Sequence, residues 1–188
     1  MSSPADTPAA RHAAVTRYDD MTIALHWVTA LLVLTQFALA ELWEFFPRPD
    51  RHLMIVAHMS FGILLGTLVA FRVVWRLAAG RRVQAVFADW MDVLAKTVHW
   101  LLYGLLLAQA VLGFLMRWSG DEAMSFFGLQ IPPPFAPWSK AAQHLTGETH
   151  EKIGWAIIIL AAGHVGAAIY HQRVLRDGVM ARMLPRRG

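Results

Sequence analysis

Uncharged stretches dominate the chain. Four runs of 19 or 20 residues, 21–40, 53–71, 97–116 and 153–172, contain no Asp, Glu, Lys or Arg. A helix of this length rises to about 30 Å, the thickness of the hydrocarbon core of a bilayer. None of the runs has the charged face that a helix keeps in a water-soluble bundle. We therefore expect an all-α integral membrane protein, a bundle of four transmembrane helices at approximately 20–43, 52–76, 91–117 and 147–172.

Composition favours this interpretation over a water-soluble four-helix bundle, because 56% of the residues are hydrophobic and the mean hydropathy is +0.42. A secretory signal is the other interpretation of the first run, and residues 38–40 resemble its cleavage site. A signal core holds only about 7–15 apolar residues, whereas this run is longer and follows about twenty mostly polar residues. We expect the run to be retained as a helix.

The connections carry their own signals. Residues 1–14 are small and polar and are expected to be disordered, and a short amphipathic helix is expected around 87–94. The connection 119–147 is the longest; its prolines at 132–134 and 137 argue against regular helix, and its aromatic residues suit a lid over the bundle mouth. The last helix is expected to begin at Thr146 or Thr149, both competent N-caps. No internal repeat is evident.

Basic residues are distributed unevenly between the two sides that this topology creates. Twelve of the 17 Lys and Arg fall in the two termini and the connection around residue 80, and five fall in the other two connections. Because loops rich in Lys and Arg stay in the cytoplasm, both termini are expected there. The net charge of +4 then reflects topology and contact with anionic lipid headgroups, and it gives no reason to expect nucleic acid as a partner.

Cysteine is absent from the sequence. Disulfides, thiolate zinc sites, iron–sulfur clusters and the covalent attachment of c-type haem are therefore excluded. Any redox cofactor has to be held by His, Met or oxygen ligands.

Apart from His52 and His171, which lie at the ends of predicted helices, five histidines lie in the predicted helices, at two depths. His26, His99 and His164 lie towards the cytoplasm, and His58 and His150 lie towards the outside. His150 and His164 are fourteen positions apart, so they share one helix face about 21 Å apart along the axis. A single buried His is usually a hydrogen-bonded packing residue, but five at two levels favour bound cofactors. The other four, at positions 12, 52, 144 and 171, are expected in loops or termini on the surface.

Haem needs only two axial imidazoles at one depth, and two such pairs can be drawn. His58 pairs with His150 at the outer level, and His26 pairs with His164 at the inner level. His99 lies at a similar depth to His26 and could replace it, so depth leaves the inner pairing open. A closed zinc or copper site would need more ligands than either level offers. We therefore expect two noncovalent b-type haems, with these histidines as the ligands of the iron.

Several short motifs occur in order along the chain. They are Arg17-Tyr18, Leu25-His26-Trp27, His58-x-x-x-Gly62, Arg72 with Trp75-Arg76, His150-Glu151, and His164 with Ala167-Ala168 and His171. With the tail from Arg176-Asp177-Gly178 to Arg182-Met183-Leu184, nearly the whole chain after Ala14 resembles the prokaryotic cytochrome b561 family. The resemblance implies a single domain over 1–188 in the bacterial cytoplasmic (inner) membrane, with two b haems. It also implies His26, His58, His150 and His164 as the ligands and leaves His99 outside the set.

The same resemblance implies electron transfer to or from membrane quinone, with ubiquinone as the expected acceptor. In one bacterial type of this family the electron donor is superoxide. For this chain the expected donor is a small molecule or a protein. Whether the chain is itself an oxidoreductase stays open. Two other functions also stay open. The chain could be the haem b membrane anchor of a larger dehydrogenase or hydrogenase, or a non-redox membrane protein whose histidines bind a metal or line a transport path.

Overall fold

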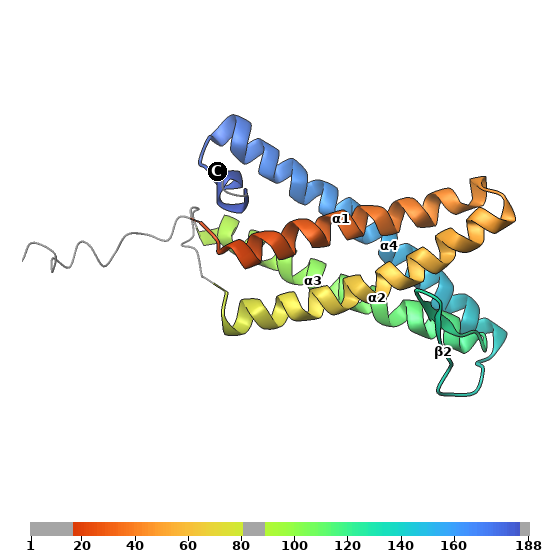
Figure 1. Cartoon of the computed structure of the whole chain (residues 1–188). Coiled ribbons are helices and arrows are strands. Elements are labelled where there is room, and N and C mark those ends of the chain that lie inside the picture. The colour runs from red at the N-terminus through yellow and green to blue at the C-terminus, as the bar shows by residue number, and fades with distance from the viewer. Residues whose placement is uncertain (1–16, 81–88, 185–188) are drawn as a thin grey trace, which may run out of the picture.

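The computed structural model describes residues 17–80 and 89–184. Four long helices form a bundle (Figure 1): α1 (Asp20–Leu42), α2 (Arg48–Ala78), α3 (Asp89–Ser119) and α4 (Lys140–Tyr170). A short 3-10 turn, η3 (Trp43–Phe45), joins α1 to α2, and two strands, β1 (Met124–Phe126) and β2 (Leu129–Ile131), lie between α3 and α4. A π-helical turn, η4 (His171–Leu175), and a 3-10 turn, η5 (Met180–Met183), follow α4.

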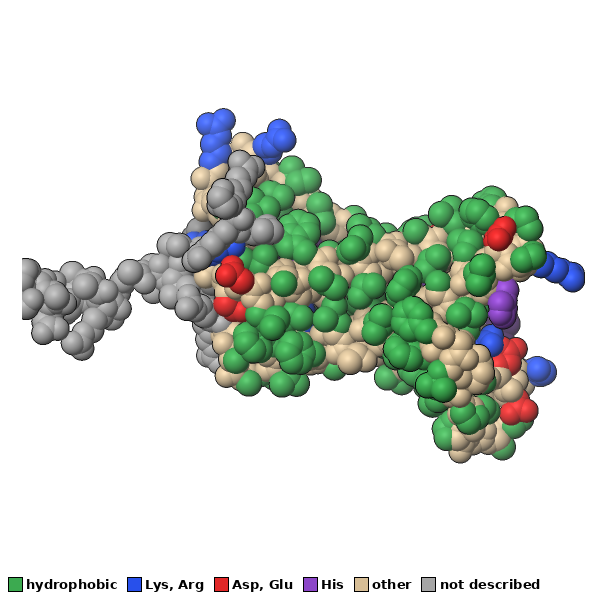
Figure 2. Space-filling view, in the orientation of Figure 1, with side chains coloured by type: hydrophobic (Ala, Val, Ile, Leu, Met, Phe, Trp, Pro, Cys, Tyr) green, Lys and Arg blue, Asp and Glu red, His purple; other side chains and the backbone are tan. Residues whose placement is uncertain are grey.

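The surface of the bundle is apolar around its middle. All four helices are long and apolar enough to cross a membrane, and side chains such as Leu31, Val111 and Ile159 are between 58% and 67% exposed. Figure 2 shows hydrophobic side chains along the middle of the molecule and charged side chains at its two ends. Water disfavours so large an apolar surface, whereas lipid accommodates it. The expectation of an all-α bundle of four membrane-spanning helices is confirmed.

Capping residues set the helix ends, and α4 begins earlier than predicted. Asp19 caps α1 as expected, because its carboxylate accepts a hydrogen bond from the Thr22 N–H at 2.8 Å. The predicted start of α4 at Thr146 or Thr149 is wrong. The N-cap is Ser139, whose hydroxyl accepts from the Ala142 N–H, so α4 begins about two turns earlier than predicted.

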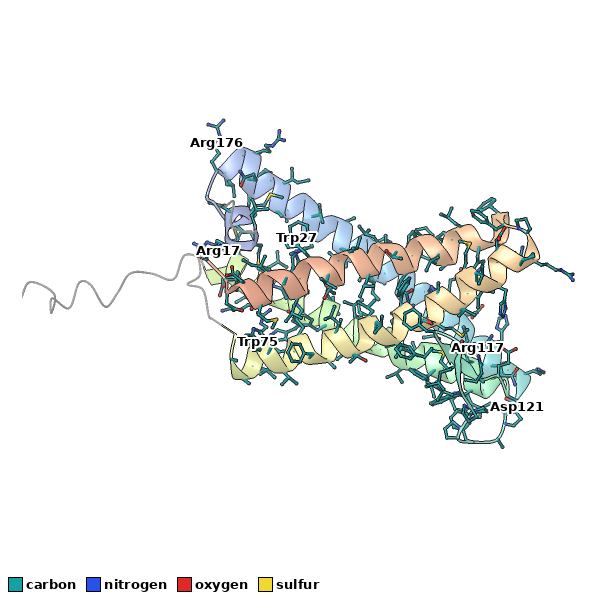
Figure 3. The ribbon with its side chains drawn as sticks, viewed as in Figure 1. Arg17, Trp27, Trp75, Arg117, Asp121 and Arg176 are labelled. Carbon is teal, nitrogen blue, oxygen red and sulfur yellow. The ribbon has the colours of Figure 1, made fainter. Side chains whose placement is uncertain are left out.

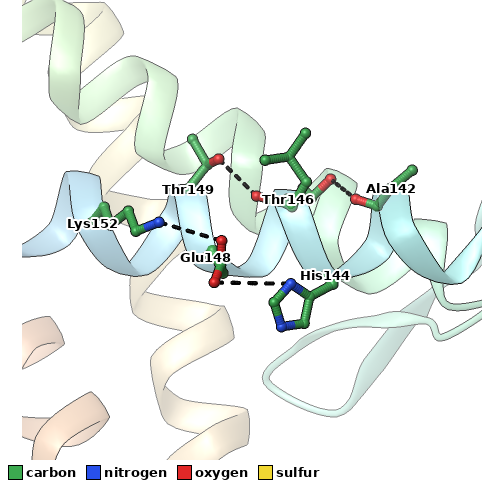
Figure 4. Close-up of polar contacts among 7 residues, drawn as sticks. Ala142, His144, Thr146, Glu148, Thr149 and Lys152 are labelled. Carbon is green, nitrogen blue, oxygen red and sulfur yellow. Dashed lines mark hydrogen bonds and ion pairs between the residues drawn. The ribbon is translucent and has the colours of Figure 1, made fainter.

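The two threonines lie inside α4 and bond back to their own helix (Figure 4). The Thr146 hydroxyl donates to the Ala142 carbonyl at 2.8 Å, and the Thr149 hydroxyl donates to the Leu145 carbonyl at 2.7 Å. Back-bonding of this kind satisfies the hydroxyl without ending the helix. The same turns hold Glu148 between His144, at 3.9 Å, and Lys152, at 3.3 Å, so His144 lies on a helix and not in a loop.

A β-hairpin that was not predicted from the sequence fills part of the connection between α3 and α4. The two strands are antiparallel, with Met124 opposite Ile131. Phe127 and Gly128 form the turn with φ of 48° and 94°, since a two-residue hairpin turn of this hand needs positive φ at both positions. The Phe127 N–H donates to the fully buried Ser60 hydroxyl of α2 at 2.8 Å, which fixes the hairpin on the bundle.

The two ends of the described chain meet at the end of the bundle opposite the hairpin. The Arg17 guanidinium donates to the Leu184 carbonyl and the Trp27 indole to the Met183 carbonyl, both at 2.8 Å. Figure 3 shows Arg17 and Trp27 at this end, which we call the termini end, and Arg117 at the other, the hairpin end. The expected disorder of residues 1–14 lies outside the described residues, as does the first part of the helix expected at 87–94; from Asp89 onwards that segment belongs to α3.

The bundle consists of two similar helical hairpins, which corrects the expectation that the chain has no internal repeat. α1 packs mainly on α2, and α3 packs mainly on α4. Each hairpin has a His-Trp pair, a Gln ten positions after that His, and a His-x-x-x-Gly motif in its second helix. These features fall at His26, Gln36, His58 and Gly62 in the first hairpin and at His99, Gln109, His150 and Gly154 in the second. The core follows the same alignment, because Leu65 and Ile157, each seven positions after the His of that motif, are both buried in it.

Candidate haem sites

His58 of α2 and His150 of α4 face each other near the hairpin end. Their ring centroids are 6.3 Å apart and their planes lie at 72°; we call them the hairpin-side pair. Both rings line a cavity of about 680 Å³ that all four long helices and β1 surround. Gly62, Gly66 and Gly113 contribute to its wall, and their missing side chains leave room for a broad ligand. The volume is in the range of sites for bound cofactors, about 300–1,000 Å³.

Contacts between α1 and α2 fix the orientation of His58. Its Nδ1 lies 3.2 Å from the backbone carbonyl of Gln36, an acceptor that requires the hydrogen on Nδ1. The Gln36 side-chain amide in turn donates to the backbone carbonyl of His58 at 3.0 Å. With the hydrogen on Nδ1, the lone pair of Nε2 is free to bind a metal, as in other sites where a carbonyl orients the ligand.

Three histidines and an arginine meet on the termini side. The His164 ring centroid lies 6.2 Å from that of His26 and 5.2 Å from that of His99. The Arg72 guanidinium lies 2.9 Å from His26 Nδ1 and stacks over the Tyr103 ring at 5.3 Å. The structure therefore brings His26, His99 and His164 together at one level. Arg72 belongs to the same cluster, and its place there was not predicted from the sequence.

The spacing of two ring pairs fits an iron atom between two imidazoles. Metal–nitrogen bonds of about 2 Å on both sides, with about 1.1 Å from each nitrogen to its ring centre, give centroids about 6.2 Å apart. The hairpin-side pair at 6.3 Å and His26/His164 at 6.2 Å match this distance, whereas His99/His164 at 5.2 Å is shorter. In residues 17–80 and 89–184, no three His, Cys, Asp or Glu side chains converge on a metal position. The donor sets therefore suit axial haem ligation and do not suit a closed metal-ion site.

Charged groups gather at the hairpin-end mouth of the cavity. Glu41, Glu44, Arg117 and Glu151 belong to its lining. Most of the basic groups near this end are neutralised: Arg51 pairs with Glu44 at 3.0 Å, Lys152 pairs with Glu148 at 3.3 Å, and Arg117 pairs with Glu122. The mouth is therefore of mixed charge and not a basic funnel.

Comparison with known proteins places the chain among bacterial membrane cytochromes. A family model described as prokaryotic cytochrome b561 matches residues 17–186. Cytochrome b561 homolog 1 and homolog 2 of Escherichia coli (strain K12) are 32% and 28% identical to the chain over 177 and 171 residues. These alignments cover 91% and 89% of this chain and 98% and 91% of the two relatives. A Yersinia pestis protein named "Probable superoxide oxidase CybB" is 27% identical over 172 residues, 91% of this chain and 97% of that protein.

Proposed function

The chain belongs to the prokaryotic cytochrome b561 family, whose members are membrane haem proteins of electron transfer, and we propose that it is a dihaem b-type cytochrome that passes electrons across the membrane to ubiquinone. His58 and His150 are the proposed ligands of one haem, and His26 and His164 those of the other. When bound, each haem supplies a one-electron carrier. The observation that carries the proposal is the pair of imidazole spacings, 6.3 Å and 6.2 Å.

The internal repeat supports His26 over His99 as the partner of His164. Arg72 and His164 each lie fourteen positions after the His of their His-x-x-x-Gly motif, so His26/Arg72 and His99/His164 are equivalent neighbours within one hairpin. His26 and Arg72 touch directly, at 2.9 Å, and the rings of His99 and His164 are also close, at 5.2 Å. The hairpin-side pair instead spans the two hairpins, and His26/His164 does the same. His26 and His164 would therefore hold a haem between the hairpins as His58 and His150 would, which favours His26 over His99.

Arg72 has to change partner if His26 binds iron. A guanidinium only donates, so its contact with His26 Nδ1 requires a lone pair on that atom. Ligation through Nε2 requires the hydrogen on Nδ1 instead, and the two groups would then be facing donors. A haem propionate is an acceptor of suitable charge for the released guanidinium, which gives Arg72 the role of a propionate partner.

The arrangement along α4 supports transfer from one membrane face towards the other. The fourteen residues between His150 and His164 separate the two levels by about 21 Å along the helix axis. The excess of Lys and Arg in the segments at the termini end supports a cytoplasmic position for both termini in the bacterial inner membrane. An electron donor outside the cell membrane would then approach the end of the bundle that carries His58 and His150. We propose to test superoxide first as the donor, because the Yersinia pestis relative is named a probable superoxide oxidase. The mixed charge at the hairpin end of the cavity gives no support for an anionic donor.

Single His→Ala variants of the purified chain test the ligand assignment by haem content. We expect His58→Ala and His150→Ala each to lose the hairpin-side haem, and His26→Ala and His164→Ala each to lose the other. His99→Ala is the matched control on the termini side and is expected to keep both haems. Loss of a haem in His99→Ala with retention in His26→Ala would reverse the pairing. A stoichiometric protein that co-purifies with the chain would favour the membrane-anchor function instead.

A further inference from the structure

The same hydrogen bond, from a Gln side chain to the backbone carbonyl of a histidine, occurs in both hairpins. The Gln36 amide of α1 donates to the backbone carbonyl of His58 in α2 at 3.0 Å. The Gln109 amide of α3 donates to the backbone carbonyl of His150 in α4 at 2.9 Å. Each Gln lies ten positions after the His-Trp pair of its helix, so the same side chain makes the same contact in both halves of the bundle.

We propose that Gln36 and Gln109 are a matched pair of positioning residues that set the placement and ring orientation of His58 and His150. The inference rests on the proposed function, because it takes these two histidines as the ligands of the hairpin-side haem. The other buried histidines serve as a contrast, since no Gln side chain among the described residues bonds the backbone of His26, His99 or His164.

Glycine makes the contact possible in each hairpin. A helical side chain covers the turn on its N-terminal side, so a Cβ four positions after a residue lies beside the carbonyl of that residue. Gly62 and Gly154 occupy this position relative to His58 and His150. A Cβ on Gly62 would lie 2.8 Å from Gln36 Nε2, and one on Gly154 would lie 3.3 Å from Gln109 Nε2. Both glycines therefore leave the carbonyl open to the amide.

The contact constrains the ligand through the backbone. Each amide joins the first helix of a hairpin to the second at the turn that bears the histidine, so the two helices cannot slide or rotate there without breaking a partly buried hydrogen bond. In the first hairpin the constraint is doubled, because the His58 ring also bonds the Gln36 backbone carbonyl at 3.2 Å. Removing an outer-shell partner of a ligand side chain changes metal affinity by about 10–100-fold, which sets the upper range for a contact that acts through the backbone.

Among the described residues, neither side-chain amide makes a second hydrogen bond. Gln36 Oε1 and Gln109 Oε1 are both buried without a hydrogen-bond partner among the described residues, and both side chains line the cavity. If each Gln only filled space, its amide nitrogen would be unpaired like its Oε1, and burying both groups without hydrogen bonds would destabilise the fold. The amide nitrogens are aimed at the two histidine carbonyls, which argues for a positioning role over plain packing.

The test compares Gln36→Leu and Gln109→Leu with Thr35→Val in the purified full-length holoprotein. Leu keeps the volume of Gln and removes the amide, and Thr35 lies next to Gln36 but bonds its own helix at the Leu31 carbonyl. We expect both Gln variants to release the hairpin-side haem about 10–100-fold more readily. In protein that still holds the hairpin-side haem, its low-spin ferric EPR signal should also shift, because that signal depends on the angle between the His58 and His150 ring planes. Thr35→Val should change neither property.

Glycine variants provide a second route that leaves both glutamines in place. Gly62→Ala should displace the amide more than Gly154→Ala, because the added carbon would lie 2.8 Å from the amide nitrogen and not 3.3 Å. Gly104→Ala is the matched control, since nothing lies within 4 Å of a Cβ there. An unchanged EPR signal and unchanged haem release in both Gln variants would overturn the inference while leaving the proposed function intact. Absence of haem b from the unaltered protein would overturn the proposed function itself.

Discussion

Gly66→Ala tests a close approach of α2 to α3. A Cβ on Gly66 would lie 2.8 Å from the Cβ of Ala110, whereas carbon atoms in contact prefer about 3.5–4.0 Å. Neither atom can rotate away, because each is bonded directly to a helix backbone. The helices therefore have to separate by about 1 Å, and overpacking of this kind costs about 1–3 kcal/mol.

Helix propensity offsets part of that cost. Replacing Gly by Ala inside a helix gains about 0.5–1 kcal/mol, so we expect Gly66→Ala to be destabilised by about 1–2 kcal/mol in net terms. Gly104→Ala, which adds a carbon with nothing within 4 Å, should show only the gain. The assay is the free energy of unfolding from SDS titration in mixed micelles, followed by far-UV circular dichroism.

A second substitution separates the steric clash from any other effect of the new methyl group. Ala110→Gly alone should lose about 1 kcal/mol of helix propensity. In the double variant Gly66→Ala/Ala110→Gly, the methyl group moves from α3 to α2 and the clash is gone, so stability should return close to that of the parent. Strictly additive effects of the two substitutions, or a Gly66→Ala variant as stable as Gly104→Ala, would refute the contact between α2 and α3.

Two further predictions concern the ends of the bundle. Ser60→Ala leaves the Phe127 N–H without its acceptor at 2.8 Å and should cost about 1–3 kcal/mol, seen as faster hydrogen exchange in the β-hairpin; unchanged exchange would mean that Ser60 does not hold it. Partial burial raises the pKa of Asp177, but hydrogen bonds from the His171 ring and the Val179 N–H outweigh it and lower that pKa from the usual 3.8. The stabilising effect of this carboxylate is therefore present above pH 3.8 and is lost as the pH falls through the lowered pKa. Limited proteolysis of the C-terminal segment with an acid-active protease, from about pH 5 down to about pH 2, should show this loss in the parent and not in Asp177→Asn.

The membrane spans and the levels of the histidines were predictable from the sequence for physical reasons. Lipid tolerates few charges in a spanning helix, so four uncharged runs marked the four helices. Imidazoles are costly in lipid unless they have partners, so His58, His150 and His164 stood out against their apolar surroundings. Helical spacing then gave two levels, and the structure brings the expected rings to 6.3 Å and 6.2 Å.

The start of α4 and the β-hairpin were not predictable in the same way. The first turns of α4 carry Lys140, Glu148 and Lys152, so the uncharged run begins well after the helix does. Ser139, like Thr146 and Thr149, has a hydroxyl that can cap a helix, so residue type alone did not distinguish the observed cap. Strands of three residues are too short to give a period-2 pattern, which needs about four to eight residues.

The internal repeat was missed because it involves few positions at long spacing. Gln36 and Gln109 have different neighbours in the sequence, and a single Gln in an apolar run resembles a chance polar residue. Their equal contacts with His58 and His150 draw attention to the alignment, which the shared motifs then extend. The repeat also explains His99, which occupies in α3 the position that His26 occupies in α1.

The haem content of the purified full-length chain tests the central proposal most directly. Haem and protein are quantified in the same sample, by the pyridine haemochrome spectrum and by amino-acid analysis, alongside a dithionite-reduced minus oxidised spectrum. Two noncovalent b-type haems per chain, both extractable by acidified acetone because the chain has no cysteine, are the predicted result. A ratio of one haem per chain, or the absence of a b-type α-band from protein produced with sufficient haem, would contradict it.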